Sequence, residues 1–124
     1  MAAIESKASI LYNLAMPALD VPKPDLSLVR EFKRRAEKAL PGRIMRVMLY
    51  GSRARGDARP DSDWDIAVFI TGEPSLEDRS ALSDIGFDLM LERGQYVQAV
   101  AIDAARSPER SYFVSNVLKD GLAA

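Results

Sequence analysis

The 124-residue chain carries a formal net charge of −1 and contains neither cysteine nor histidine. Its length and its 48% hydrophobic content suit one compact domain with a single core. The missing residue types exclude disulfides, Cys/His zinc sites, cysteine nucleophiles and histidine general bases. The balanced charge argues against a nucleic-acid partner bound through overall charge. Any bound metal would have oxygen ligands, which favours a hard cation such as Mg²⁺ or Mn²⁺.

The charge is unevenly distributed along the chain. Residues 30–59 hold ten Lys/Arg against three Asp/Glu, whereas residues 60–124 hold five against twelve. Such a split commonly means only that helix faces differ in charge. The alternative is that cationic groups lie beside an acidic site, an arrangement that suits an anionic ligand bound together with a metal.

The first 24 residues are set apart from the rest. Two prolines in "DVPKPD" (20–25) block a continuous helix, so we expect an N-terminal arm or extra helix over 1–24, or a frayed terminus. Residues 25–124 would then form the folded domain, and the arm could pair copies of the chain. The apolar stretch 10–19 is too short to span a bilayer and makes a poor signal peptide, so we expect a cytoplasmic protein without membrane association.

The next elements predict a helix followed by two strands. A cap at Asp25 or Ser27 begins the helix, and Pro41 lies just beyond its end. The runs 43–50 and 63–70 are rich in apolar and β-branched residues, which predicts two buried strands. The apolar stripe expected on the helix consists of Val29, Phe32, Ala36 and Leu40.

The second half of the chain continues the alternation of helices and strands. A capping box of Ser75 and Asp78 begins a helix that ends at Gly94. The run 96–102 predicts a third strand, and Ser107-Pro108 predicts the start of a last helix over 107–121. The whole is a small α/β domain with a mixed sheet of three to four strands. The inward-facing residues expected on these helices are Leu82, Ile85, Leu89, Phe113 or Val114, and Val117.

The second strand carries two acidic residues at its start. Side chains alternate along a strand, so Asp63 and Asp65 share one face, while Trp64 and the apolar residues that follow it at every second position pack on the other. Two carboxylates roughly 6–7 Å apart at the Cα atoms repel each other. A divalent cation bound to both would neutralise them. The simpler interpretation is a solvated turn, because D-x-D alone is short and common.

The loop before these aspartates offers groups that bind phosphate. Gly51 follows the first strand directly, where a sharp turn needs a residue without a Cβ. The hydroxyl and amide of Ser52, with the amides of Arg53 and Ala54, can form a concave set of donors for phosphate oxygens. Each part alone could be an ordinary turn, but their combination with the aspartates predicts one site. Positive charge suited to phosphate is added by Arg53, Arg55 and Arg59.

The motif G-S-x10-D-x-D, formed by Gly51, Ser52, Asp63 and Asp65, resembles the signature of the DNA polymerase beta-like nucleotidyltransferase superfamily. The string "LYGSRARGDARPDSDWDIAV" is similar to the minimal nucleotidyltransferases, small proteins often paired with HEPN-domain toxins. The resemblance implies that Gly51 and Ser52 bind the nucleotide triphosphate, with Arg53 and Arg55 nearby. It also implies that Asp63 and Asp65 hold Mg²⁺ or Mn²⁺ and are catalytic.

The resemblance further implies an activity and a partner. Such a protein would transfer AMP from ATP to a hydroxyl, a tyrosine of a HEPN toxin, and would act as the antitoxin. Full members carry a third carboxylate on the next strand, where this chain has Gln98 as the probable equivalent; Asp103 lies about five residues beyond. Glutamine cannot accept a proton. An alternative is therefore a catalytically degenerate module that neutralises its partner by contact alone, and a third is nucleotide transfer to a small molecule.

Overall fold

Residues 24–124 are described here from a computed structural model, and the N-terminal arm expected over 1–24 lies outside them except for Pro24. A four-stranded sheet with the order β3-β2-β1-β4 forms the centre of the domain. β1 pairs antiparallel with β2 and with β4, whereas β2 and β3 are parallel. The mixed sheet confirms the predicted α/β class. The strands are β1 (Ile44–Tyr50), β2 (Trp64–Ile70), β3 (Val97–Asp103) and β4 (Leu122–Ala123).

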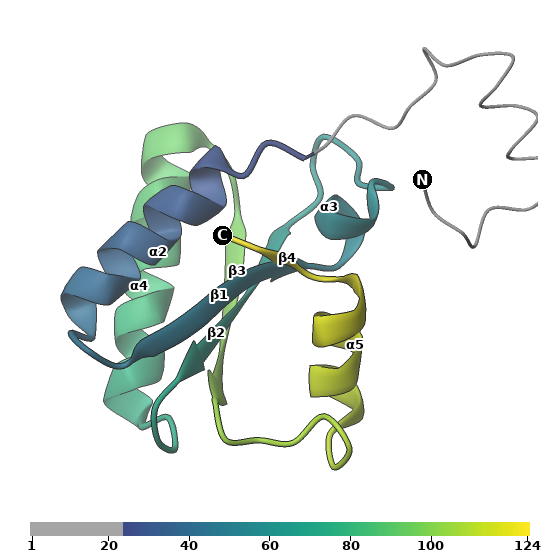
Figure 1. The fold of residues 1–124 in the computed structure, drawn as a ribbon. Helices are drawn as coiled ribbons and strands as arrows, with labels where there is room; N and C mark the ends of the chain where they lie inside the picture. The colour runs from purple at the N-terminus through teal and green to yellow at the C-terminus, as the bar shows by residue number, and fades with distance from the viewer. Residues whose placement is uncertain (1–23) are drawn as a thin grey trace, which may run out of the picture.

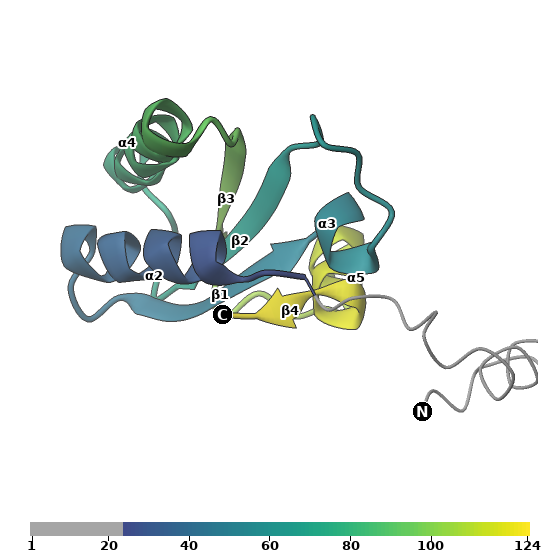
Figure 2. The same cartoon turned by 90° about the horizontal axis from the view of Figure 1, so that it is seen from above.

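Helices cover both faces of this sheet. α2 (Ser27–Ala39) and α4 (Leu76–Arg93) lie on one face, and α5 (Tyr112–Asp120) lies on the other (Figure 1). The view from above shows the same arrangement, with α3 (Ser52–Arg55) beside α5 at the end of β1 (Figure 2). α4 is the crossover that parallel strands require between β2 and β3. No helix in the described part is long and apolar enough to cross a membrane.

The core lies on both sides of β2. Ile66 and Val68 pack with α2 and α4, as the alternation predicted, and Ala67 and Phe69 pack with α5. Each fully buried large apolar side chain contributes about 1.5–3 kcal/mol relative to exposure. β2 is therefore fixed from both faces, and so is the direction of Asp65 at its start. β1 is buried only over Val47, Met48 and Leu49, whereas Met45 near its start remains 63% exposed.

The helix termini largely follow the sequence signals. Asp25 accepts a hydrogen bond from the Ser27 amide at 2.9 Å just before α2, although Leu26 occupies the N-cap position. The capping box of Ser75 and Asp78 is formed at the start of α4. The predicted apolar stripes of both helices are buried. Local capping chemistry thus sets where α4 begins, whereas α2 begins after Leu26 without a side-chain cap, so the predicted cap at Asp25 or Ser27 was wrong.

The prediction of a helix from Ser107 was wrong. α5 begins at Tyr112, and a short turn precedes it, because Ser111 is extended (φ −138°, ψ 111°) and its hydroxyl caps the helix by accepting from the Val114 amide at 3.2 Å. Inside the helix, Val114 and Val117 are buried, whereas Phe113 remains 40% exposed.

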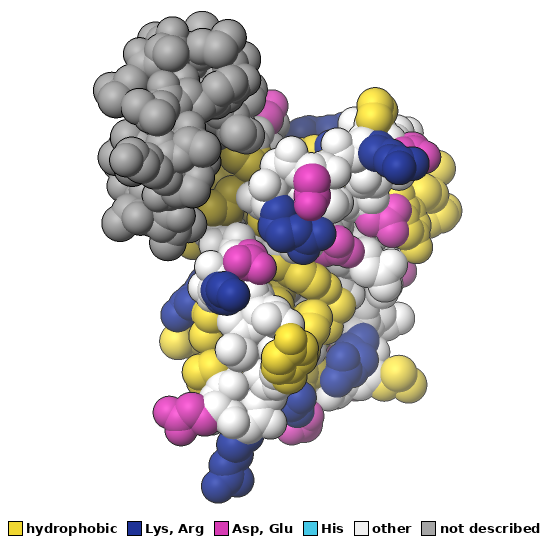
Figure 3. Space-filling view, turned by 90° about the vertical axis from the view of Figure 1, so that its right-hand side faces the viewer, with side chains coloured by type: hydrophobic (Ala, Val, Ile, Leu, Met, Phe, Trp, Pro, Cys, Tyr) yellow, Lys and Arg dark blue, Asp and Glu magenta, His cyan; other side chains and the backbone are white. Residues whose placement is uncertain are grey.

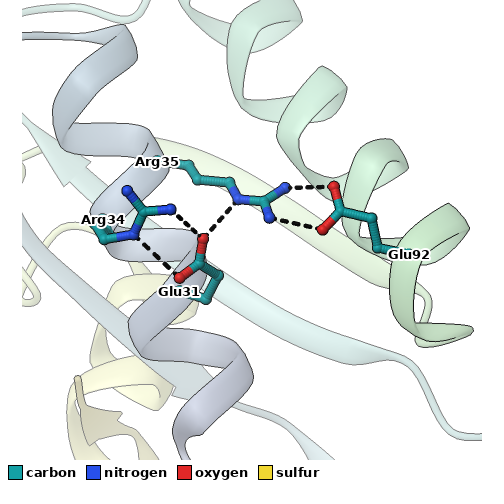
Figure 4. Close-up of polar contacts among 4 residues, drawn as sticks. All are labelled: Glu31, Arg34, Arg35 and Glu92. Carbon is teal, nitrogen blue, oxygen red and sulfur yellow. Dashed lines mark hydrogen bonds and ion pairs between the residues drawn. The ribbon is translucent and has the colours of Figure 1, made fainter.

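The two helices on one sheet face are joined by charged residues. Glu31 of α2 accepts hydrogen bonds from Arg34 and Arg35, and Arg35 also donates to Glu92 of α4 at 2.7 and 3.0 Å (Figure 4). The hydrogen bonds from the two arginines lower the pKa of Glu31 to about 2. This network lies away from the aspartates and serves the packing of α2 on α4.

Candidate functional site

The two aspartates lie at the end of the sheet where β1 ends and β2 begins. Asp63 is exposed and immediately precedes β2, and Asp65 is the second residue of that strand. Asp65 pairs with Tyr50 of β1 on one side and with Gln98 of β3 on the other. Asp65 therefore lies on β2, between β1 and β3. Its side chain is on the same sheet face as Ala67 and Phe69, which pack against α5.

The electrostatics of the pair show an unbalanced negative charge. Partial burial and then the charge of Asp63 raise the pKa of Asp65, with Arg55 opposing them. Burial and the charge of Asp65 likewise raise the pKa of Tyr50. Both shifts favour the protonated, uncharged form of the side chain, because a further negative charge at this position is unfavourable. A bound cation would relieve this repulsion without a change in the fold.

Gly51 brings the backbone of the loop against Asp65. Its φ of 76° lies in the region that favours glycine, and a Cβ at this position would overlap the Asp65 carboxylate. The sequence predicted a glycine for a sharp turn. The structure adds that glycine is needed here for close approach as well. The loop and the carboxylate are thus two walls of one site.

α3 uses part of the predicted donor set. The carbonyl of Gly51 accepts hydrogen bonds from the amides of Ala54 at 3.1 Å and Arg55 at 3.0 Å. The Ala54 amide, which was predicted to bind phosphate, is therefore already occupied. Ser52 and Arg53 come first in α3, where amides have no acceptor within the helix. In residues 24–124 these two amides have no other backbone acceptor. They, with the Ser52 hydroxyl, remain as donors next to Asp65.

The side chain of Arg53 is engaged elsewhere, contrary to its predicted role at phosphate. Its Nε and Nη2 donate to the carbonyl of Ser62 at 3.1 and 2.9 Å, and Nη2 also reaches the carbonyls of Arg59 and Pro60. Its guanidinium carbon lies 4.5 Å from the centre of the Trp64 ring. Backbone carbonyls leave no pattern in a sequence, so this role could not be inferred there.

Two other arginines of the loop are exposed. Arg55 lies 3.4 Å from Asp57 and lowers the pKa of Asp65, so its charge acts toward the aspartates. The side chain of Arg59 has no hydrogen bond or ion pair to the part of the chain that the structure describes. Arg55 is therefore the arginine of this loop that is best placed to meet a phosphate.

The register of β2 and β3 places Gln98 beside Asp65 on the same face of the sheet. Asp103 pairs with Ile70 at the opposite end of these strands, as the sequence spacing predicted. Over residues 24–124 no three Asp, Glu, His or Cys side chains come close enough to hold a metal. Two carboxylates are nevertheless sufficient for Mg²⁺ when phosphate oxygens and water complete its ligands.

A cavity of about 230 Å³ adjoins the loop and α5. Tyr50, Gly51 and Arg55 line it from the loop side, and Phe113, Asn116, Val117 and Asp120 line it from α5. The rings of Tyr50 and Phe113 meet edge to face at 5.4 Å. The sequence interpretation missed the polar residues of this wall, because it used α5 only for its buried stripe. On the described part of the face seen in Figure 3, basic and acidic side chains are intermixed and form no single basic patch.

Comparisons with known proteins identify related sequences and structures. The family model described as "Polymerase beta, Nucleotidyltransferase" matches residues 32–120. A protein of Methanocaldococcus jannaschii that is named as a protein adenylyltransferase is 32% identical over 60 residues. That match covers 48% of this chain and 61% of the relative.

Solved structures share the fold at lower identity. A mutant of the toxin-antitoxin MntA-HpeT superimposes with a TM-score of 0.58 at 17% identity, covering 76% of this chain and 69% of that one. A toxin-antitoxin structure with AMP-PNP gives 0.59 at 19% identity, with 80% and 71% covered. A protein from Sulfolobus solfataricus named as a nucleotidyltransferase gives 0.55 at 23% identity, with 98% and 90% covered. At these identities the likeness shows the fold.

Proposed function

The chain belongs to the polymerase beta nucleotidyltransferase family, and from this premise we propose that it transfers AMP from ATP to a protein hydroxyl. The observation that carries the proposal is the close approach of Gly51 to the carboxylate of Asp65, where a Cβ on Gly51 would overlap the carboxylate. Ser52, with its donors, follows Gly51 directly in the chain, so a triphosphate and a divalent cation would meet at this end of the sheet. Either group alone would have an ordinary structural explanation.

Each site residue then has a defined role. Gly51, the amides of Ser52 and Arg53, and the side chain of Arg55 would bind the phosphates. Asp63 and Asp65 would hold Mg²⁺ or Mn²⁺. When bound, such a cation stabilises the charge on the attacking and leaving oxygens of an in-line displacement. The acceptor oxygen would form a bond to the α-phosphorus while the bond from that phosphorus to the α,β-bridging oxygen breaks. Pyrophosphate would leave with this oxygen, and the hydroxyl proton would pass to solvent.

The cavity next to Gly51 is suited to the nucleoside of the nucleotide. It shares Gly51 and Arg55 with the phosphate loop and has an aromatic wall of Tyr50 and Phe113. The carboxylate of Asp120 disfavours a further phosphate and suits a ribose hydroxyl. A nucleotide bound in this way would place its phosphates at Ser52 and its neutral part against α5.

The acceptor is proposed to be a tyrosine of a HEPN toxin, which would make this chain a cytoplasmic antitoxin. Three observations support this step: the family, a relative named as a protein adenylyltransferase, and the fold shared with toxin-antitoxin structures. The acceptor would be supplied by a separate protein, as the toxin-antitoxin neighbours suggest. The domain proposed to act in this way spans residues 25–124.

A second candidate is a degenerate binding module that neutralises its partner by contact. Gln98 favours it, because glutamine stands where a third carboxylate would face Asp65 and cannot accept the hydroxyl proton. This candidate predicts protection of the cell without a covalent product.

One experiment separates the two. The protein is incubated with Mg-ATP and the HEPN protein of its own genome, and the partner's intact mass is measured. Transfer predicts an adenylyl adduct with wild type and with Asp61→Asn, which removes a nearby exposed charge, but none with Asp63→Asn/Asp65→Asn. An adduct that persists in the double variant, or that never forms with wild type, would remove the proposal.

A further inference from the structure

Arg53 connects α3 to the turn that leads into the aspartates. Four hydrogen bonds from its guanidinium end on backbone carbonyls of this turn, at distances of 2.9 to 3.2 Å. Two of them converge on the carbonyl of Ser62. That carbonyl belongs to the peptide that joins Ser62 to Asp63. The orientation of this peptide sets where the chain places Asp63.

The turn itself is short and internally bonded. The amide of Ser62 donates to the carbonyl of Arg59 at 3.0 Å, and the Ser62 hydroxyl accepts from the Arg59 amide at 2.8 Å. These bonds close the turn but do not attach it to the domain. The side chain of Arg53 attaches the turn to α3 through its hydrogen bonds to the carbonyls of this turn.

Trp64 holds the other side of Arg53. Its ring packs under the guanidinium, its indole donates to the side chain of Gln95 at 2.7 Å, and its amide donates to the carbonyl of Tyr96 at 2.8 Å. Trp64 is thereby fixed to the start of β3. A guanidinium stacked on an aromatic ring is attracted by the ring face and kept in one orientation. The turn, β2 and β3 are thus joined through one side chain.

Asp63 and Asp65 differ in what holds them. Asp65 lies inside the strand ladder, between Tyr50 and Gln98. Asp63 precedes the strand and is exposed, so its position depends on the turn. We propose that Arg53 is a positioning residue that keeps Asp63 next to Asp65, in a conformation ready to share a divalent cation. The inference rests on the proposed function, because it concerns the metal site of that function.

The chain offers a matched control. Arg59 lies in the same loop, is exposed, and carries the same charge, but none of the hydrogen bonds and ion pairs of residues 24–124 involves its side chain. Arg53→Met and Arg59→Met remove the same charge from the same region. Arg53→Lys keeps a cation over Trp64 but loses the planar donor fork. A role at phosphate would depend on charge, whereas a positioning role depends on the carbonyl contacts.

The test measures Mn²⁺ affinity by electron paramagnetic resonance of free Mn²⁺, together with binding of tripolyphosphate in EDTA. We expect Arg53→Met to weaken Mn²⁺ binding about tenfold, as loss of a supporting residue commonly does, and Arg53→Lys to fall between it and wild type. Tripolyphosphate binding should weaken equally in Arg53→Met and Arg59→Met, which lose the same charge, whereas Arg59→Met should bind Mn²⁺ like wild type. Wild-type Mn²⁺ affinity in Arg53→Met, or equal losses of Mn²⁺ affinity in Arg53→Met and Arg59→Met, would overturn the inference.

A second readout needs no metal and separates this inference from the proposed function. Amide hydrogen exchange over residues 57–63 should accelerate in Arg53→Met and not in Arg59→Met, with melting followed by circular dichroism as a control for folding. Unchanged exchange in Arg53→Met overturns the positioning role even if wild type binds no Mn²⁺. If Arg53→Met does not fold, the same comparison is decided by Arg53→Lys. Failure of wild type to bind Mn²⁺ would instead count against the proposed function.

Discussion

Gly51 and Asp65 lie so close that no side chain fits between them, since a Cβ on Gly51 would overlap the Asp65 carboxylate. The contact joins the end of β1 to the start of β2. It is also the point at which the candidate phosphate donors meet the candidate metal ligand. The consequences of this contact can be tested separately from those of backbone strain.

Gly51→Ala should abolish nucleotide binding that depends on a divalent cation. The methyl group would force the loop and the carboxylate apart, in addition to the cost of about 1–3 kcal/mol for a Cβ at φ 76°, ψ −156°, a conformation that is essentially confined to glycine. Gly42→Ala is the control for a positive φ without the close approach, because Gly42 has a φ of 72° and a methyl group added there would meet nothing within 4 Å. Calorimetric titration with Mg-ATP should show binding for Gly42→Ala and none for Gly51→Ala. Equal binding by the two variants would contradict the close-approach role.

Asp65→Asn should stabilise the metal-free protein while it removes the activity. Burial and the charge of Asp63 raise the pKa of Asp65 in the folded state, so its ionised form is disfavoured there. The penalty is present above the folded pKa and is relieved as the pH falls through it. At pH 7 we therefore expect a higher Tm for metal-free Asp65→Asn than for metal-free wild type. Mg²⁺ should raise the Tm of wild type more than that of the variant, and a lower Tm for metal-free Asp65→Asn would refute this interpretation of the pair.

The cavity beside Gly51 predicts a split between nucleotide and phosphate binding. Asn116→Ala and Asp120→Ala should weaken binding of an ATP analogue but leave binding of tripolyphosphate unchanged, because these side chains line the cavity from α5. Ser115→Ala is the control, since Ser115 is exposed on the same helix and does not line that cavity. Parallel titrations with the two ligands would decide. Equal losses for both ligands would place the phosphates, not the nucleoside, in the cavity.

Gln98→Asp should accelerate transfer. The β2–β3 register would put the new carboxylate beside Asp65, where it could accept the hydroxyl proton. General-base catalysis is commonly worth about 10²–10⁴-fold, and we expect the lower end of that range. The isosteric comparison is Gln98→Asn, which should not gain. Initial rates of pyrophosphate release with the partner protein measure the effect, and equal rates for the Asp and Asn variants would show that this position does not handle the proton.

The network between α2 and α4 gives a pH-dependent prediction unrelated to catalysis. The two arginines lower the pKa of Glu31 to about 2, so its contribution to stability is present above the ordinary pKa near 4.5 and is lost as the pH falls toward 2. Glu31→Gln should therefore be less stable than wild type at pH 7, and the difference should shrink below about pH 4.5 and be lost as the pH falls through about 2. Urea unfolding across this range measures it, with the exposed Glu37→Gln as the control. A difference that does not shrink between pH 4.5 and 2 would assign the effect to packing.

The sequence was sufficient where local chemistry or strict alternation decides. Large apolar residues at every second position of β2 fixed its register, and with it the direction of Asp65. The capping box of Ser75 and Asp78 located the start of α4 for a similar reason. Both signals lie within a few residues of what they determine.

The features that could not be predicted depend on contacts between distant segments or on weak local competition. The approach of Gly51 to Asp65 follows from the pairing of β1 with β2, and the partners of Arg53 are backbone carbonyls. The last helix was predicted to start at Ser107, but it starts after Ser111, because the Ser111 hydroxyl accepts a hydrogen bond from the Val114 amide. β4 has only two residues, too few for any periodicity, and forms because the chain after Gly121 returns along β1.

The proposed activity is tested most directly by following two labels of ATP into the partner protein. ATP labelled at the α-phosphate should label the HEPN partner in the presence of Mg²⁺ and wild-type protein, whereas ATP labelled at the γ-phosphate should not. The label should disappear with Asp63→Asn/Asp65→Asn and remain with Asp61→Asn. Transfer of the γ-label, or no transfer of either label by wild type, would contradict nucleotidyl transfer at this site.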